Sequence, residues 1–280
     1  YFKVSLSAYY TPVSTADTVT GVAFFSKKVI LYGSEGSVKV FTSEYCVDDM
    51  DIQKNYSYLD KNVAEIRSKM AEANASGNQV VLLAAVKSAD IDEINYIHRH
   101  LGIDDIGENR VQQLLERWDH LDREGLRVHF IGSLQTNKVK YIIDKVHLIH
   151  SLDSHKLAAE IDKQAKKHGI IANVLVEINS GGEENKGGID PDNVPNFCAE
   201  MSQYENVRVC GFMTMAPKCE DRTEYFKYFN STREIAVKVW RGVLSREGDP
   251  IISMGMSESF EEAIICGSNM VRVGRSMFAK

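Results

Sequence analysis

Apolar and polar positions in residues 57–280 follow two alternating periods. Short apolar runs typical of buried strands are each followed by a stretch with apolar residues at helical spacing. Eight runs are predicted to be strands, and each of the first seven precedes a predicted helix. The predicted strands cover residues 79–87, 105–108, 127–131, 146–150, 172–179, 206–213, 250–254 and 270–274.

Strict alternation of strands and helices predicts a parallel sheet. Eight such units in roughly 220 residues fit a single TIM-type (β/α)8 barrel. A doubly wound open sheet is the alternative, but no Gly-x-Gly-x-x-Gly motif opens the first unit. An extra helix, predicted at 57–76, precedes the first strand. We expect it to cover the barrel side that follows strand eight.

Residues 1–50 differ from the rest of the chain. They are rich in Tyr, Phe, Ser, Thr, Val and Gly, and their first 34 residues contain one acid, Asp17. The hydroxyl content resembles an organelle transit peptide, but the absence of arginine argues against that interpretation. Because the chain starts at Tyr1 and not at Met, a small β-hairpin, a mis-assigned exon and a vector remnant are the other interpretations. We assign this segment no function.

The overall composition, with 44% hydrophobic and 26% charged residues, is that of a soluble globular protein. A net charge of −6 argues against a nucleic acid or an anionic membrane as the main partner. No segment approaches the ~18 consecutive apolar residues of a membrane helix. The five cysteines form no Cys-x-x-Cys pair, so we expect free thiols and a cytoplasmic location, or an organelle if residues 1–50 are a transit peptide.

Two histidines, His147 and His150, raise the question of a metal site. Strand spacing predicts that their rings point to opposite faces, and no acidic or cysteine ligand lies beside them. We therefore expect no metal.

Lys87 lies at the C-terminal end of the first predicted strand. Active groups of such barrels come from the C-terminal strand ends. Burial would favour the neutral amine, and a neutral amine forms a Schiff base with an aldehyde. A strand-end lysine whose ammonium group reaches water is the alternative.

The ends of predicted strands seven and eight are rich in small residues, namely Ser253, Gly255, Ser257, Gly274 and Ser276. Backbone N–H groups and hydroxyls bind phosphate, glycine lets the backbone approach it, and the loops after these two strands are the usual phosphate site of the fold. Ser257, followed by Glu258 and Glu261, also fits a plain helix cap. A Schiff-base lysine with a phosphate site across the barrel matches pyridoxal 5′-phosphate.

Seven sequence blocks at the strand ends resemble the pyridoxal phosphate homeostasis protein family, whose members are similar to the barrel domain of alanine racemase. The resemblance spans residues 57–280, with blocks at 85–87, 107–112, 129–138, 179–188, 211–217, 253–257 and 271–274. It implies that Lys87 forms the internal aldimine and that Arg272 faces the pyridine nitrogen. It also implies that Asn109 lies near the cofactor and that three residues help to hold the phosphate: Ser253, Gly255 and Gly274.

The chain departs from the family pattern after Gly274. Arg275 stands where the family usually has Thr or Ser, and Ser276 follows it. The backbone N–H of Arg275 can still serve the phosphate, and its guanidinium adds a positive charge.

Two functions compete, a cofactor carrier and a racemase. Racemisation needs a base on each face of the cofactor. In the racemases the second base is a tyrosine from the second domain of a partner subunit, whereas only about six residues follow the last predicted strand here. A permanent cation at the ring nitrogen also weakens the cofactor as an electron sink. We therefore expect a non-catalytic protein that stores, buffers or delivers pyridoxal phosphate. We expect it to be a monomer or weak dimer, with pyridoxal phosphate-dependent apo-enzymes as partners.

Overall fold

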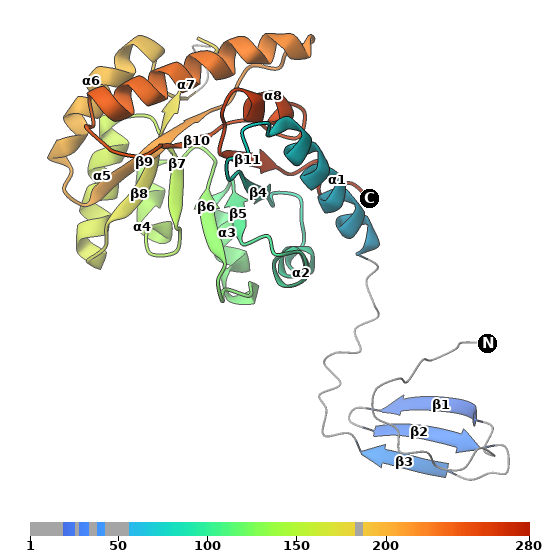
Figure 1. Cartoon of the computed structure of the whole chain (residues 1–280). Helices are drawn as coiled ribbons and strands as arrows, with labels where there is room; N and C mark the ends of the chain where they lie inside the picture. Colours follow the sequence, from blue (N-terminus) through green and yellow to red (C-terminus); the bar gives the residue numbers. More distant parts are fainter. Residues whose placement is uncertain (1–18, 26–27, 34–37, 43–55, 183–186) are drawn as a thin grey trace. The chain divides into compact units, whose positions relative to one another are not determined.

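The computed structural model describes residues 19–25, 28–33, 38–42, 56–182 and 187–280 (Figure 1). The chain forms two compact units, residues 1–55 and residues 56–280. The first unit contains an antiparallel sheet in which β2 (Lys28–Gly33) lies between β1 (Val19–Phe25) and β3 (Val38–Thr42).

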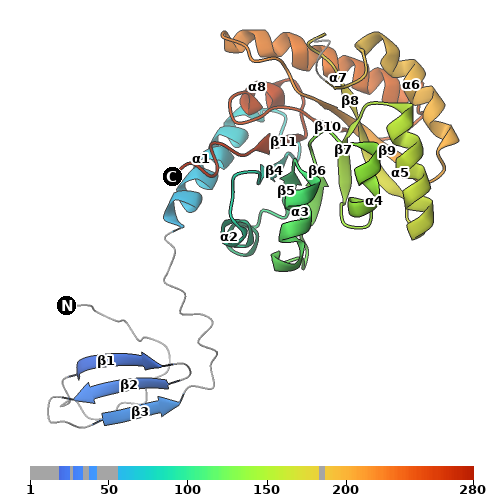
Figure 2. The same cartoon turned by 180° about the vertical axis from the view of Figure 1, so that it is seen from behind.

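The second unit is a closed barrel of eight strands that pair in parallel, which confirms the predicted (β/α)8 barrel (Figures 1 and 2). The barrel closes where the last strand pairs with the first. Its strands are β4 (Val81–Ala85), β5 (Asp105–Glu108), β6 (Arg127–Phe130), β7 (Leu148–Leu152), β8 (Ala172–Ile178), β9 (Val207–Thr214), β10 (Ile251–Ser253) and β11 (Met270–Val273).

Helices surround the barrel strands. They are α1 (Ser57–Ala73), α2 (Ile91–Leu101), α3 (Val111–Arg117), α4 (Val139–Ile142), α5 (His155–His168), α6 (Val194–Glu200), α7 (Tyr225–Gly242) and α8 (Phe260–Ile265). Short 3-10 turns extend several of them: η2 (Trp118–His120), η3 (Thr136–Lys138), η4 (Pro191–Asn193), η5 (Met201–Gln203) and η6 (Arg222–Glu224). Such turns are common at helix ends, and they replace parts of the longer helices predicted from the sequence.

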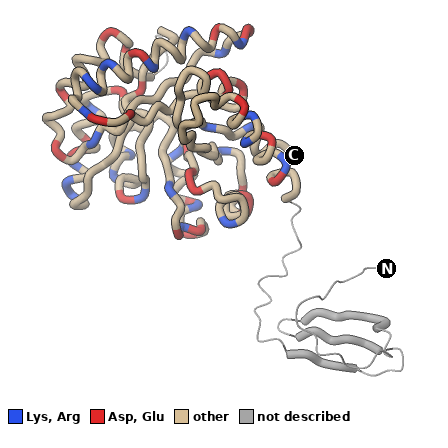
Figure 3. Tube along the Cα trace, in the orientation of Figure 1, with Lys and Arg blue, Asp and Glu red and all other residues tan. Residues whose placement is uncertain are grey.

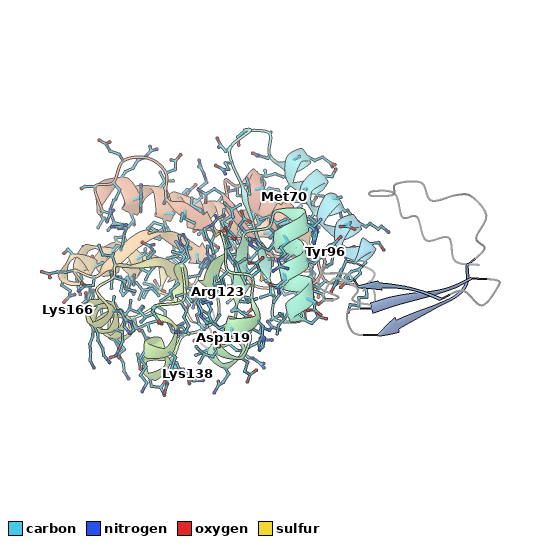
Figure 4. The ribbon with its side chains drawn as sticks, turned by 90° about the horizontal axis from the view of Figure 1, so that it is seen from below. Met70, Tyr96, Asp119, Arg123, Lys138 and Lys166 are labelled. Carbon is cyan, nitrogen blue, oxygen red and sulfur yellow. The ribbon has the colours of Figure 1, made fainter. Side chains whose placement is uncertain are left out.

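The extra helix α1 covers the barrel side beside β11, as expected. It packs against α8 and, on its other side, against α2 (Figure 2). Its buried face carries Leu59, Val63, Ile66 and Met70, which recur at helical spacing. Asn62 also donates a hydrogen bond to the carbonyl of Met277, at 3.0 Å. Figure 4 labels Met70 and Tyr96 on the neighbouring helices α1 and α2.

Charged residues of both signs are interspersed along the helices and loops of the barrel unit (Figure 3). Within the residues that the structure describes, no helix combines the length and apolar character required to cross a bilayer. The described cysteines, Cys198, Cys210, Cys219 and Cys266, are free thiols, whereas Cys46 lies outside the described residues.

The start of α2 offers a direct test of the local structure. The Asp90 side chain accepts the Glu93 N–H at 2.8 Å, and the Glu93 side chain accepts the Asp90 N–H at 2.7 Å. We expect Asp90→Ala to lower the free energy of unfolding by about 1 kcal/mol, because it removes this capping box. Asp90→Asn keeps a capping oxygen and should lose much less. Urea denaturation of both variants measures the difference; equal losses would contradict the assignment of the cap.

Candidate functional site

Lys87 lies just beyond the C-terminal end of β4. The strand ends at Ala85, Val86 is buried, and Lys87 is exposed within a turn. The expectation that Lys87 ends a buried strand is therefore wrong, because the chain leaves the sheet two residues earlier than predicted. Because Lys87 is exposed, the structure gives no support to the argument from burial.

The backbone around Lys87 is nevertheless fixed by two side chains of α3. Gln113 donates to the Lys87 carbonyl at 3.0 Å. Arg117 donates to the carbonyls of Val86, at 3.0 Å, and Ala89, at 2.5 Å. The same guanidinium donates to the fully buried carboxylate of Glu108 at 2.7 Å. This clamp holds the turn in place while the lysine side chain stays accessible.

The loops after β10 and β11 meet at Ser257. Its hydroxyl accepts the N–H groups of Gly274, at 3.3 Å, and Ser276, at 3.4 Å. The interpretation of Ser257 as a helix cap is wrong, because α8 begins only at Phe260. Ser257 instead joins the two small-residue loops into one cradle, as an anion site at these strand ends requires.

Two glycines of this cradle have no room for a side chain. Gly255 has a φ of 91°, and a Cβ there would lie 2.6 Å from the Cβ of Ala263. A Cβ on Gly274 would lie 2.7 Å from the carbonyl oxygen of Ala85. The second contact shows that the cradle lies beside the β4 end, and not across the barrel as expected, because β11 and β4 are paired neighbours.

Two buried oxygens at the site lack a protein partner. The Oδ1 atom of Asn109 and the Oγ atom of Ser276 accept no hydrogen bond from any described residue. Buried polar atoms in folded proteins are nearly always paired, so these two favour a polar ligand at the strand ends. Arg275, in contrast, is exposed and forms an ion pair with Glu258 at 2.8 Å. Its guanidinium therefore already has an acidic partner.

A cavity of about 420 Å³ opens next to the cradle. Ser257 and Ser276 line it together with residues of α1 and α8 and with Arg222. Lys87, Asn109 and Arg272 are not among its lining residues, so this cavity lies beside the candidate site and is not its centre.

Arg272 is buried inside the barrel with its guanidinium held on two sides. Nη1 donates to the carbonyl and the hydroxyl of Ser253, both at 2.7 Å, and Nη2 donates to the carbonyl of Thr214 at 2.9 Å. Burial lowers the pKa of Arg272 to about 10, against the attraction of Glu177. The hydroxyl of Ser253 is thus occupied by Arg272, and we place Ser253 behind this arginine and not at the phosphate as expected.

Glu177, at the end of β8, was not identified as a site residue from the sequence. It is buried, and burial together with the charge of Asp153 raises the pKa of Glu177 to about 7, although Arg272 opposes the shift. An acid at the end of a predicted barrel strand was the signal that could have identified it.

His147 and His150 are arranged differently from the expectation. β7 begins only at Leu148, so strand spacing does not relate the two rings. Both face the ring of His129, with centroid distances of 5.6 Å for His147 and 5.2 Å for His150. His150 and His129 are buried in the barrel, while His147 is exposed.

Comparison with known proteins identifies the family of this chain. The family model for the N-terminal domain of alanine racemase matches residues 55–280. The pyridoxal phosphate homeostasis protein of Aquifex aeolicus is 40% identical over 225 residues, which cover 79% of this chain and 96% of the relative. The one of Schizosaccharomyces pombe is 31% identical, covering 76% and 89%. The chain belongs to the pyridoxal phosphate homeostasis protein family.

Solved structures that resemble this chain have the same barrel fold. PipY of Synechococcus elongatus, solved with PLP bound, is 26% identical and has a TM-score of 0.69, with 79% of this chain and all of that chain covered. An alanine racemase of Clostridium difficile is 17% identical and has a TM-score of 0.63. The match covers 80% of this chain and 57% of the racemase chain, and it shows a shared fold alone. The family and barrel predicted from the sequence are confirmed.

The clamp on the Lys87 turn can be tested by stability measurements. We expect Arg117→Met to lower the free energy of unfolding by roughly 3 kcal/mol, because it leaves the buried Glu108 carboxylate unpaired. A double variant, Glu108→Leu with Arg117→Met, should regain part of this loss, since it removes both charges but still lacks the donor to the carbonyls of Val86 and Ala89. Arg123→Met changes an exposed arginine and serves as the control in urea denaturation. A loss in the double variant as large as in Arg117→Met would contradict this account.

The raised pKa of Glu177 predicts that the free energy of unfolding depends on pH. Its pKa is about 7 in the folded protein and near 4.5 when unfolded, so between these values only the folded state holds the proton. The folded state therefore loses stability as pH rises through this window, by on the order of 3 kcal/mol. We expect Glu177→Gln to raise the melting temperature relative to the unmodified protein at pH 8 and to have much less effect at pH 4.5. Melting curves at both values check this, and an equal effect would refute it.

Proposed function

We propose that this protein binds pyridoxal phosphate and acts in intracellular vitamin B6 homeostasis by storing, buffering or delivering the cofactor. The observation that carries the proposal is the site itself. The unpaired oxygens of Asn109 and Ser276, the cradle at Ser257 and the Lys87 turn all lie at the C-terminal strand ends. PipY with PLP bound and relatives named as homeostasis proteins support the same conclusion.

The proposed contacts follow the chemistry of each residue. When bound, pyridoxal phosphate supplies an aldehyde that condenses with a lysine amine, forming a C=N bond and releasing water. We assign this amine to Lys87. The N–H group of Arg275 and the hydroxyl of Ser276 would bind the phosphate, with Gly255 and Gly274 leaving room for the backbone.

Arg272 gives the reason for proposing a carrier and not an enzyme. A pKa of about 10 keeps its guanidinium charged at neutral pH. A cation opposite the pyridine nitrogen disfavours protonation of that nitrogen, and an unprotonated ring stabilises a carbanion poorly. Racemisation would therefore be slow. Free thiols on the four described cysteines support a reducing location such as the cytoplasm, where apo-enzymes would receive the cofactor.

Visible absorption with chemical trapping tests this function. We expect the purified protein to turn yellow with pyridoxal phosphate, and borohydride followed by peptide mass spectrometry to find the label on Lys87. Lys87→Ala should abolish both signals, because it removes the amine. Lys163→Ala, which changes a surface lysine that is 73% exposed, should preserve them. A protein that stays colourless would refute the function, and a label on another lysine would refute the site. Chiral chromatography after incubation with L-alanine tests the racemase alternative, and measurable D-alanine would favour it.

A further inference from the structure

A row of buried polar side chains crosses the interior of the barrel behind Arg272. Four neighbouring or nearby strands each contribute one: Asp105 from β5, His129 from β6, His150 from β7 and Ser253 from β10. All four are less than a tenth exposed. Buried polar groups are unfavourable unless they are hydrogen-bonded, so their placement in an otherwise apolar interior needs an explanation.

The four side chains form one continuous chain of hydrogen bonds. His129 Nε2 lies 2.9 Å from Oδ1 of Asp105, and its Nδ1 lies 3.0 Å from Nε2 of His150. His150 Nδ1 lies 3.2 Å from the hydroxyl of Ser253, which in turn accepts Nη1 of Arg272 at 2.7 Å. At the other end, Arg127 donates to both carboxylate oxygens of Asp105, at 2.8 and 2.6 Å.

The groups at the two ends fix the direction of the terminal bonds. Burial opposes the charge of Asp105, but hydrogen bonds from Arg127 and His129 outweigh it and hold the pKa of that carboxyl well below its usual range. As a carboxylate it only accepts, so Nε2 of His129 donates. His129 Nδ1 and His150 Nε2 share one hydrogen bond, and the Ser253 hydroxyl bonds to His150 Nδ1 while its oxygen accepts from Arg272.

Burial and nearby charged groups favour the neutral form of His150. His150 faces His129 on β6 and Arg272 on β11, and burial together with these two groups lowers the pKa of His150 well below its usual value. His129 faces Asp105, His150 and the exposed His147. Glu177 on β8 interacts with Arg272.

The chain of bonds also limits what Arg272 can do. A guanidinium has five N–H groups. Three are used on Ser253 and Thr214, which leaves two for a ligand. Rotation of the guanidinium would break its bond to the Ser253 hydroxyl, and that hydroxyl is itself held by His150.

We propose that His129 and His150 are positioning residues: as a hydrogen-bonded relay anchored on Asp105, they fix the Ser253 hydroxyl and thereby hold the Arg272 guanidinium in one orientation toward the ring nitrogen of a bound heteroaromatic ligand. This inference depends on the proposed function only for the identity of the ligand, which is pyridoxal phosphate. The relay itself is a property of the unloaded protein.

Long-range ¹H–¹⁵N spectra of the unloaded protein test the relay directly, with His129→Gln and His150→Gln used to assign the signals. We expect a ¹⁵N–¹⁵N coupling across the hydrogen bond between His129 Nδ1 and His150 Nε2. Absence of this coupling would overturn the proposal. The coupling is measured in the unmodified protein, and the two variants serve only to assign its signals.

Binding of pyridoxal phosphate gives the second readout, with two neighbouring acids as a matched pair. Asp105→Asn removes the anchor of the relay. Asp104→Asn changes the adjacent acid, which pairs with His98 at 3.0 Å and lies outside the relay. We expect Asp105→Asn to weaken binding roughly tenfold and to shift the visible absorption maximum, as loss of one charge-assisted contact predicts. Asp104→Asn should behave as the unmodified protein.

The outcomes separate the two proposals. Equal affinity and spectra for Asp105→Asn and the unmodified protein would overturn the relay while leaving the function intact. Failure of the unmodified protein to bind pyridoxal phosphate would overturn the function, and the imidazole spectra would still decide the relay.

Discussion

The pairing of β11 with β4 is the constraint on which the candidate site depends. These are the last and first strands of the barrel, and their register places Val273 opposite Ala84. The same register brings Gly274 against the carbonyl of Ala85, two residues before Lys87. The proposed phosphate cradle and the proposed attachment point are therefore about 190 residues apart in sequence and adjacent in space. Neither half of the proposed site is complete until the barrel closes.

The interior of the barrel carries more charge than stability alone would favour. Arg272, Glu177 and Asp105 are all buried, and replacing buried charges by apolar residues of similar size is often neutral or stabilising. The fold tolerates two of them because they have specific partners: Arg272 binds Ser253 and Thr214, and Asp105 binds Arg127 and His129. The raised pKa of Glu177 shows that its environment still disfavours its charge. Natural proteins commonly keep such destabilised groups at functional sites.

The sequence was sufficient for the barrel and for the family, because both depend on periodicity and on local motifs. It was insufficient where tertiary contacts decide. The apolar run 79–87 gave no sign that the chain leaves the sheet at Val86, since Val86 is buried outside the strand. Ser253 and Ser257 look equivalent as small residues near a strand end. Only the packed structure places one behind Arg272 and the other between two loops. The relay through His129 and His150 links strands that are distant in sequence, and no local pattern predicts it.

The contrast between Lys87 and Arg272 bears on how the protein would work. Lys87 is exposed, but its backbone is fixed by Gln113 and Arg117. Arg272 is buried, and its side chain is fixed by hydrogen bonds. In the proposed complex, an exposed amine could pass its aldehyde to water or to another amine. A buried, oriented cation would keep the ring nitrogen unprotonated and so suppress carbanion chemistry. A carrier of the proposed kind would need both properties, and the two residues that would supply them lie at the ends of the neighbouring strands β4 and β11.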